Sequence, residues 1–260
     1  MVSRLAARMR WVAVASLVAA SAVEARPLRP RFEPTDLELE VPGTLEVDVQ
    51  VGYVDATPTS RVVLPDFELD LGLTKRFELD LDGEYSLYLG AIDGSHPETL
   101  WLSGKVGLFD VVLPSKLTLA GGVQVGPRIA GLRAIGGVGV DGLVLFGLTY
   151  GRVQLAGNVG GYWDPTHAQN DGTRKRPRGV QLGGSVDVDL TRDRRWSFHV
   201  EVGATVSLAV DPNQLVLAAG IVLAPTRSLE VSLLGLVGLL PGSDRAGALL
   251  GAAPKILLWR

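Results

Sequence analysis

The sequence predicts an all-β fold: a transmembrane, antiparallel, up-and-down β-barrel of about 12 strands. Three observations lead to this prediction. Apolar and polar residues alternate with a period of two, the side-chain period of a β-strand, through most of the chain. Tight turns and longer loops alternate along the chain, and no segment has a clear helical period. Several segments are apolar on both faces, which a soluble β protein would have to expose to water.

The alternation is clearest in residues 76–90, RFELDLDGEYSLYLG. Its odd positions hold mostly Phe, Leu and Tyr, and its even positions include Glu78, Asp80, Asp82 and Glu84. One face of this strand is therefore apolar and the other carries four carboxyl groups. If the apolar face meets lipid, the acids point into the lumen.

Strand-like segments follow one another from residue 44 to the end of the chain. We expect strands at residues 44–55, 61–73, 76–90, 99–111, 115–128, 137–149, 152–163, 178–190, 195–209, 214–224, 227–239 and 246–259. A tilted strand needs roughly 9–11 residues to cross a bilayer, and these segments have that length or slightly more.

The connections predict how the barrel is oriented. Even-numbered strands are followed by the tight turns LTKR, LPSK, TYGR, TRDRR and APTRS. Odd-numbered strands are mostly followed by longer loops, with the DPN link near residue 211 as a short exception. This layout is typical of a bacterial outer-membrane barrel with both termini in the periplasm.

The N-terminus has the pattern of a secretory signal peptide. Residues 1–25 combine a basic start, a short apolar run and small residues before Arg26. The alternative is an uncleaved membrane helix, for which the apolar run is short. We expect a signal peptide at 1–25, a Pro-rich periplasmic lead-in at 26–43 and the outer-membrane barrel at 44–260.

Composition excludes some classes of function. The whole chain has a formal charge of −3 and no cysteine. Loss of residues 1–25 removes three arginines and Glu24, which leaves −5 on the mature chain. A mildly acidic exported protein is a poor candidate for binding nucleic acid. Without disulfides, its stability must come from sheet closure or burial.

Two late strands argue against a soluble sandwich. The second face of residues 214–224 and 227–239 carries Val216, Ala218, Leu234 and further apolar residues. A soluble protein would expose one apolar face or the other in this region, whereas a barrel in lipid needs a continuous apolar exterior. We expect small or polar residues in the barrel interior.

Residues 64–89, LPDFELDLGLTKRFELDLDGEYSLYL, resemble a family of outer-membrane transporters of the phenol-degradation meta-cleavage pathway. In that family a strand ending in Gly-Leu-Thr leads to a strand beginning Arg-x-Glu, as residues 72–78 do here. Residues 153–164 and 196–204 resemble its later strands. The resemblance implies a monomeric outer-membrane pore or uptake channel, with a substrate class often assumed to be hydrophobic or aromatic.

The candidate functional residues line the predicted lumen. Nine acids on the first three strands would form a negative wall that favours cations: Glu46, Asp48, Asp66, Glu68, Asp70, Glu78, Asp80, Asp82 and Glu84. The alternative is structural, because Lys105, Lys116 and Arg128 could pair with these acids and fill the interior. Acids this close together must be paired, hydrated or protonated.

A catalytic alternative involves His199 and Glu201, which share a face of one strand with Ser197. A Ser–His–acid arrangement would suggest an outer-membrane hydrolase, but neighbours at i and i+2 on one strand only line a wall. Residues 137–142, GVGVDG, match a dinucleotide motif but open into a strand instead of a helix. We expect no enzyme activity, no cofactor and no metal site.

The expected function is passive uptake of a small-molecule solute through a narrow barrel with an acidic wall. A closed structural or ligand-binding barrel is the first alternative, and a hydrolase using His199 is the second. Expected partners are outer-membrane lipid, lipopolysaccharide near the basic residues 173–178, and the barrel assembly machinery. Outer-membrane barrels usually end in an aromatic residue that the assembly machinery recognises, whereas here the last residue is Arg260 and the aromatic Trp259 precedes it.

Overall fold

The computed structural model describes residues 39–56, 60–89, 95–130, 138–163, 167–168, 174–175, 178–208 and 212–259. The predicted signal peptide, most of the predicted lead-in and much of the basic loop segment lie outside these residues. Among the described residues, no helix is long and apolar enough to cross a lipid bilayer.

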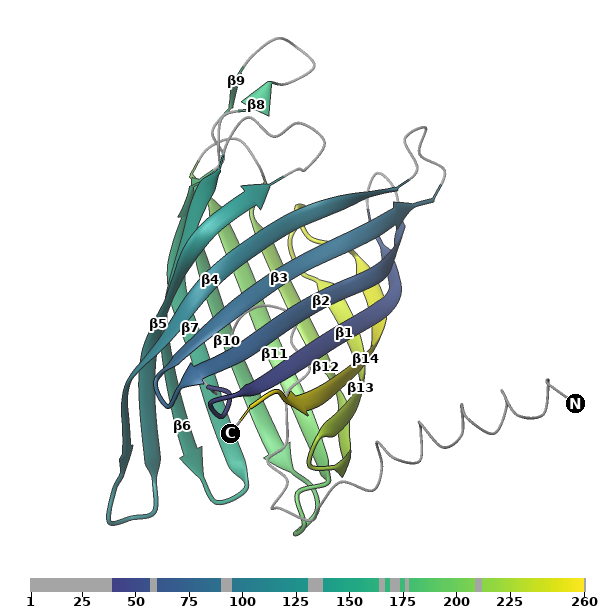
Figure 1. The fold of residues 1–260 in the computed structure, drawn as a ribbon. Helices are drawn as coiled ribbons and strands as arrows, with labels where there is room; N and C mark the ends of the chain where they lie inside the picture. Colours follow the sequence, from purple (N-terminus) through teal and green to yellow (C-terminus); the bar gives the residue numbers. More distant parts are fainter. Residues whose placement is uncertain are drawn as a thin grey trace, which may run out of the picture.

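Twelve antiparallel strands close into a barrel (Figure 1). They are β1 (Thr44–Asp55), β2 (Arg61–Thr74), β3 (Phe77–Tyr88), β4 (Ser95–Val112), β5 (Thr118–Ala130), β6 (Gly139–Tyr150), β7 (Val153–Trp163), β10 (Arg178–Asp189), β11 (Trp196–Ser207), β12 (Gln214–Thr226), β13 (Leu229–Gly238) and β14 (Ala246–Leu257). The predicted fold class is confirmed, with strand ends that differ by a few residues. The short strands β8 (His167–Ala168) and β9 (Arg174–Lys175), which were not predicted, pair separately in the longest loop.

Each barrel strand pairs with its neighbour along the chain, and β1 pairs with β14 to close the barrel. Thr44 lies opposite Leu257, so the start of β1 and the end of β14 share one rim (Figure 1). The tight turns lie at this end, which we call the short-turn rim. The longer connections lie at the opposite end, which we call the long-loop rim.

The period of two sorts side chains between the outside and the inside of the barrel. On β3, Glu78 and Asp80 are 0% and 1% exposed, whereas Leu79 between them is 37% exposed. On β13, Leu234 is 1% exposed and its neighbour Leu233 is 61% exposed. The exterior is therefore apolar, as a barrel in lipid requires, and the acids of β3 point inward.

One part of the interior differs from the sequence expectation. Seven inward apolar residues from β1, β2, β12, β13 and β14 form a buried cluster: Val54, Val63, Val216, Ala218, Leu234, Leu236 and Leu249. Three of them are leucines, although small or polar side chains were expected inside the barrel. The interior therefore has an acidic sector on β1–β3 and an apolar sector on β12–β14, and the apolar sector extends through Val54 and Val63 to the long-loop ends of β1 and β2.

Candidate functional site in the barrel lumen

The acids of the first three strands form cross-strand rows on the inner wall. Glu46 pairs in register with Asp70, which in turn pairs with Asp80. The next row contains Asp48, Glu68 and Asp82. Directly opposed like charges destabilise a sheet unless other groups compensate them. Six predicted acids are at most 9% exposed, namely Glu46, Asp48, Glu68, Asp70, Glu78 and Asp80, while Asp66, Asp82 and Glu84 are half-buried.

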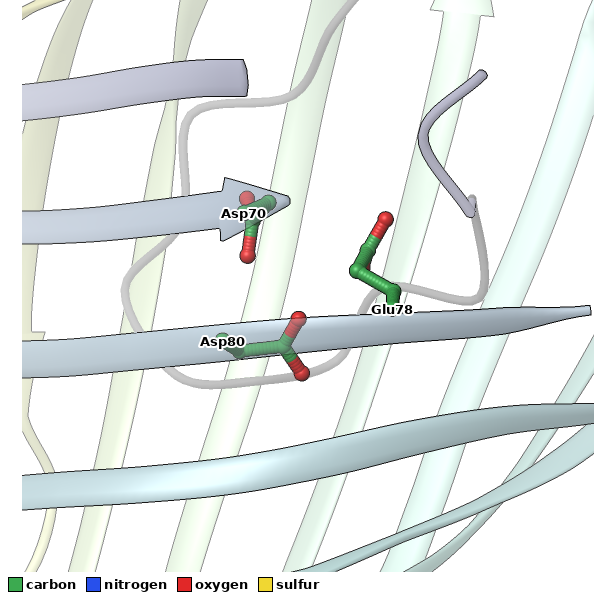
Figure 2. Close-up of side chains that lie close together, drawn as sticks. All are labelled: Asp70, Glu78 and Asp80. Carbon is green, nitrogen blue, oxygen red and sulfur yellow. The ribbon is translucent and has the colours of Figure 1, made fainter. Parts of the chain in front are cut away.

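Asp70, Glu78 and Asp80 make the tightest group of carboxylates (Figure 2). Each offers an oxygen within 4.8 Å of the others, and all three side chains are buried. Among the described residues, this is the group of acids whose oxygens could together bind a metal ion. No metal site was expected here from the sequence.

Donors from three other segments already contact this group. Lys105 Nζ lies 2.7 Å from Glu78 Oε1, and the backbone N–H of Glu40 donates to the other oxygen of the Glu78 carboxylate. Asp80 Oδ2 accepts hydrogen bonds from Gln124 Nε2 at 2.8 Å and from Ser103 Oγ at 3.2 Å. An ammonium and neutral donors thus compensate part of the negative charge, as the structural alternative for Lys105 predicted.

The five residues 39–43, which end the predicted lead-in, lie along the inner wall at the short-turn rim. The Glu40 carboxylate pairs with Lys255 Nζ on β14, which also lies 3.3 Å from Glu46. Glycines make room for this segment. A Cβ on Gly72 would come within 2.6 Å of the Val41 carbonyl oxygen, and one on Gly107 would lie 2.8 Å from Leu39 Cδ1. The segment therefore narrows the lumen at this end.

Two other predicted cations have different environments. Arg128 faces inward, with Nη1 2.9 Å from Asp141 Oδ2 and its guanidinium 4.9 Å from the centre of the Tyr162 ring. Lys116 does not line the wall, because β5 begins at Thr118 and not at residue 115. Lys116 instead lies in the β4–β5 turn, exposed and with a φ of 63°. Its predicted role in pairing with the acids is wrong.

His199 is buried between two carboxylates on the wall formed by β10 and β11. Its Nδ1 lies 2.8 Å from Asp187 Oδ1, and its Nε2 lies 3.2 Å from Glu201 Oε2. Both ring nitrogens are therefore engaged by acids, and neither is free to take a proton from Ser197. A general base must reach its nucleophile directly or through one water. This geometry disfavours the hydrolase alternative.

Two cavities open at opposite ends of the lumen. The long-loop cavity has a volume of about 340 Å³, and its lining includes Val63, Glu84 and Asp244. The short-turn cavity has a volume of about 540 Å³, and its lining includes Leu39 and Asp187. Many inward side chains elsewhere in the described lumen are closely packed: Asp80, Leu145, Glu201 and Leu234 are each 1% exposed.

Several residues that contact the site were missing from the sequence prediction, among them Asp187, Gln124, Glu40 and Lys255. Asp187 could have been found, since it shares the period-two alternation of residues 178–190 with Asp189. Gln124 lies on a predicted strand, but a lone amide gives little signal. The partners Glu40 and Lys255 are more than 200 residues apart in the sequence, and only closure of the barrel brings them together.

No protein-family model matches the chain. No curated protein matches it significantly by sequence. Solved structures do match it.

The NanC porin superposes with a TM-score of 0.60 at 9% identity, over 81% of this chain and 100% of that one. The COG4313 outer membrane channel from Pseudomonas putida F1 superposes with a TM-score of 0.59 at 14% identity, over 87% of this chain and 100% of that one. The chain has the fold of an outer-membrane porin barrel. At these identities the likeness concerns the fold alone, and the resemblance to the phenol-degradation transporter family stays a prediction.

Proposed function

We propose that this chain is an outer-membrane channel for passive uptake of small solutes. The observation that carries this proposal is a closed 12-stranded barrel with an apolar exterior and buried ionisable groups on its inner wall. Charged side chains are costly on a lipid-facing wall, so this distribution suits a barrel that is surrounded by hydrocarbon. The fold similarity to NanC and to the COG4313 channel supports the same function.

The proposed orientation has both termini and the short-turn rim in the periplasm. It rests on the loop lengths, because outer-membrane barrels have short periplasmic turns and longer extracellular loops. Membrane fractionation and heat-modifiable migration on a gel test the location. The expected result is a folded band in the outer-membrane fraction that migrates differently after boiling. Recovery as a detergent-free monomer in buffer would contradict the proposal.

The acidic wall is proposed to favour cations. A wall of one charge sign raises the local concentration of the opposite ion, especially between walls of low dielectric constant. Neutralising Glu78, Asp80 and Asp82 together, as Gln, Asn and Asn, is expected to move the reversal potential in a salt gradient toward zero. Asp193→Asn is the control, because Asp193 lies exposed in the β10–β11 turn. Unchanged selectivity in the triple variant would leave the acids with a packing role.

A closed barrel is the second candidate, and the burial of inward side chains favours it. Glu78 and Leu234 lie on different walls and are 0% and 1% exposed, so water hardly reaches them in the described conformation. Planar-bilayer conductance of the purified protein separates the two candidates. Discrete conductance steps support a channel, and their absence with correctly folded protein supports a closed barrel.

A further inference from the structure

The long-loop cavity combines two kinds of wall. It lies between the ends of β1–β3 and β11–β12 and the loop that joins β13 to β14. Its volume of about 340 Å³ falls in the range of small-molecule sites, which is roughly 300–1,000 Å³. Sites of this kind join an apolar surface to a few polar groups that orient the ligand.

Four lining residues make an apolar surface in this cavity. Val54, Val63 and Leu249 are at most 3% exposed, and Val216 is 9% exposed. They belong to the buried cluster that continues along β12 and β13 through Ala218, Leu234 and Leu236. A hydrophobic body in the cavity would therefore rest on packed side chains and would displace water from an apolar wall.

Carboxylates outnumber cations on the charged wall of the same cavity. Arg61 contacts Glu84 Oε1 through Nε at 3.1 Å and Asp244 Oδ1 through Nη1 at 2.7 Å. One guanidinium is thus shared by two acids, and the carboxylate of Asp66 also lines the cavity. Glu84 Oε2 and Asp244 Oδ2 accept no hydrogen bond within the described chain, and both side chains remain partly exposed. The wall therefore offers acceptors to a ligand.

We propose that the long-loop cavity binds a small amphipathic ammonium: a primary amine, protonated at neutral pH, that carries an aromatic or alkyl body. The ammonium would donate to Glu84 and Asp244 while the body packs on Val216 and the valines of β1 and β2. A bare cation would not use the apolar wall. An anion would have to displace the acids from Arg61. A role for this site as the first binding step of uptake rests on the proposed function. Binding of the ammonium does not itself require that the barrel conducts.

Isothermal titration of the purified full chain in detergent tests the site with four probes. Phenethylammonium is the expected ligand, methylammonium lacks the body, 2-phenylethanol lacks the charge and 3-phenylpropionate reverses it. Phenethylammonium should bind at least tenfold more tightly than each of the others. Equal binding of the alcohol, or tighter binding of the carboxylate, would overturn the proposal.

Variants locate the binding. Glu84→Gln and Asp244→Asn should each weaken phenethylammonium binding roughly tenfold, since each removes a charge-assisted hydrogen bond. Asp193→Asn carries the same kind of change at the opposite rim and should bind as the parent does. Heat-modifiable migration shows that each variant is folded. Unchanged affinity in both folded variants would refute the site.

The outcome is separable from the channel proposal. Conductance without selective amine binding removes this inference and leaves the channel. Selective amine binding without conductance keeps the site and makes the chain a closed, ligand-binding barrel.

Discussion

Asp70 on β2 lies directly opposite Asp80 on β3, with both side chains buried on the inner wall. Two carboxylates in this position repel each other and lose hydration, so the fold has to supply compensating donors. Lys105 forms an ion pair with the neighbouring Glu78 and so places a positive charge near the two aspartates. Gln124 and Ser103 donate hydrogen bonds to Asp80. The acidic sector of the wall is therefore a connected network, and removing a single donor should have large effects.

Replacing Lys105 by Met should destabilise the barrel by about 3–5 kcal/mol, because it leaves the Glu78 carboxylate buried without its ammonium partner. The measurement is the free energy of unfolding in urea, with the protein in lipid vesicles. Lys116→Met is the matched control, since Lys116 lies exposed in a turn and should change stability by less than about 0.5 kcal/mol. Equal effects of the two changes would show that Lys105 has no special role in the network.

Replacing Gly72 by Ala should displace residues 39–41 from the inner wall. The added methyl group would collide with the carbonyl oxygens of Glu40 and Val41. If the barrel conducts, single-channel conductance should rise because the short-turn rim becomes wider. Gly235→Ala is the control, since a Cβ there would have its nearest neighbour at 3.9 Å. If Gly72→Ala and Gly235→Ala both have the conductance of the parent, residues 39–41 do not limit the conductance of the pore.

Replacing Leu233 by Arg tests whether the exterior contacts lipid. Leu233 is 61% exposed in the middle of β13, so in a water-soluble barrel the change would cost little. In a bilayer it should cost about 2–4 kcal/mol, against about 0–1 kcal/mol for Leu239→Arg just beyond the end of β13. Unfolding titrations in vesicles compare the two. Similar costs at both positions would argue against a lipid-facing wall.

Replacing His199 by Ala should not abolish conductance. It should reduce the free energy of unfolding by about 3–5 kcal/mol, because the carboxylates of Asp187 and Glu201 lose the imidazole that both contact. Hydrolysis of a p-nitrophenyl ester should not exceed the detergent blank in the parent or in the variant. Ser197→Ala is the companion variant. An ester hydrolase activity in the parent that disappears in both variants would revive the catalytic alternative.

The period of two was enough to predict the barrel strands and the inward direction of the acids. It works because an antiparallel barrel with one apolar face repeats the same local pattern on most of its strands. Strand ends were less well predicted. For example, β4 begins at Ser95 and not at residue 99, and β5 begins at Thr118, which moved Lys116 from the wall into a turn.

The alternation of apolar and polar residues could not predict contacts between strands that are distant in the sequence. The pair of Glu40 with Lys255, and the shared use of Arg61 by Glu84 and Asp244, depend on how loops and strand ends meet across the barrel. The apolar interior of β12 and β13 was also missed as a feature of the lumen. When both faces of a strand are apolar, alternation shows which residues share a face but not whether that face meets lipid or the lumen.

The pairing of β1 with β14 also constrains how the protein matures. The first strand of the barrel along the chain must pair with the last strand, as Glu46 does with Lys255. Until the final strand is available, the edges of the unfinished sheet expose unpaired backbone groups, which hydrocarbon does not tolerate. Insertion of the barrel into a bilayer therefore has to wait until the segment that forms β14 is available to pair with β1.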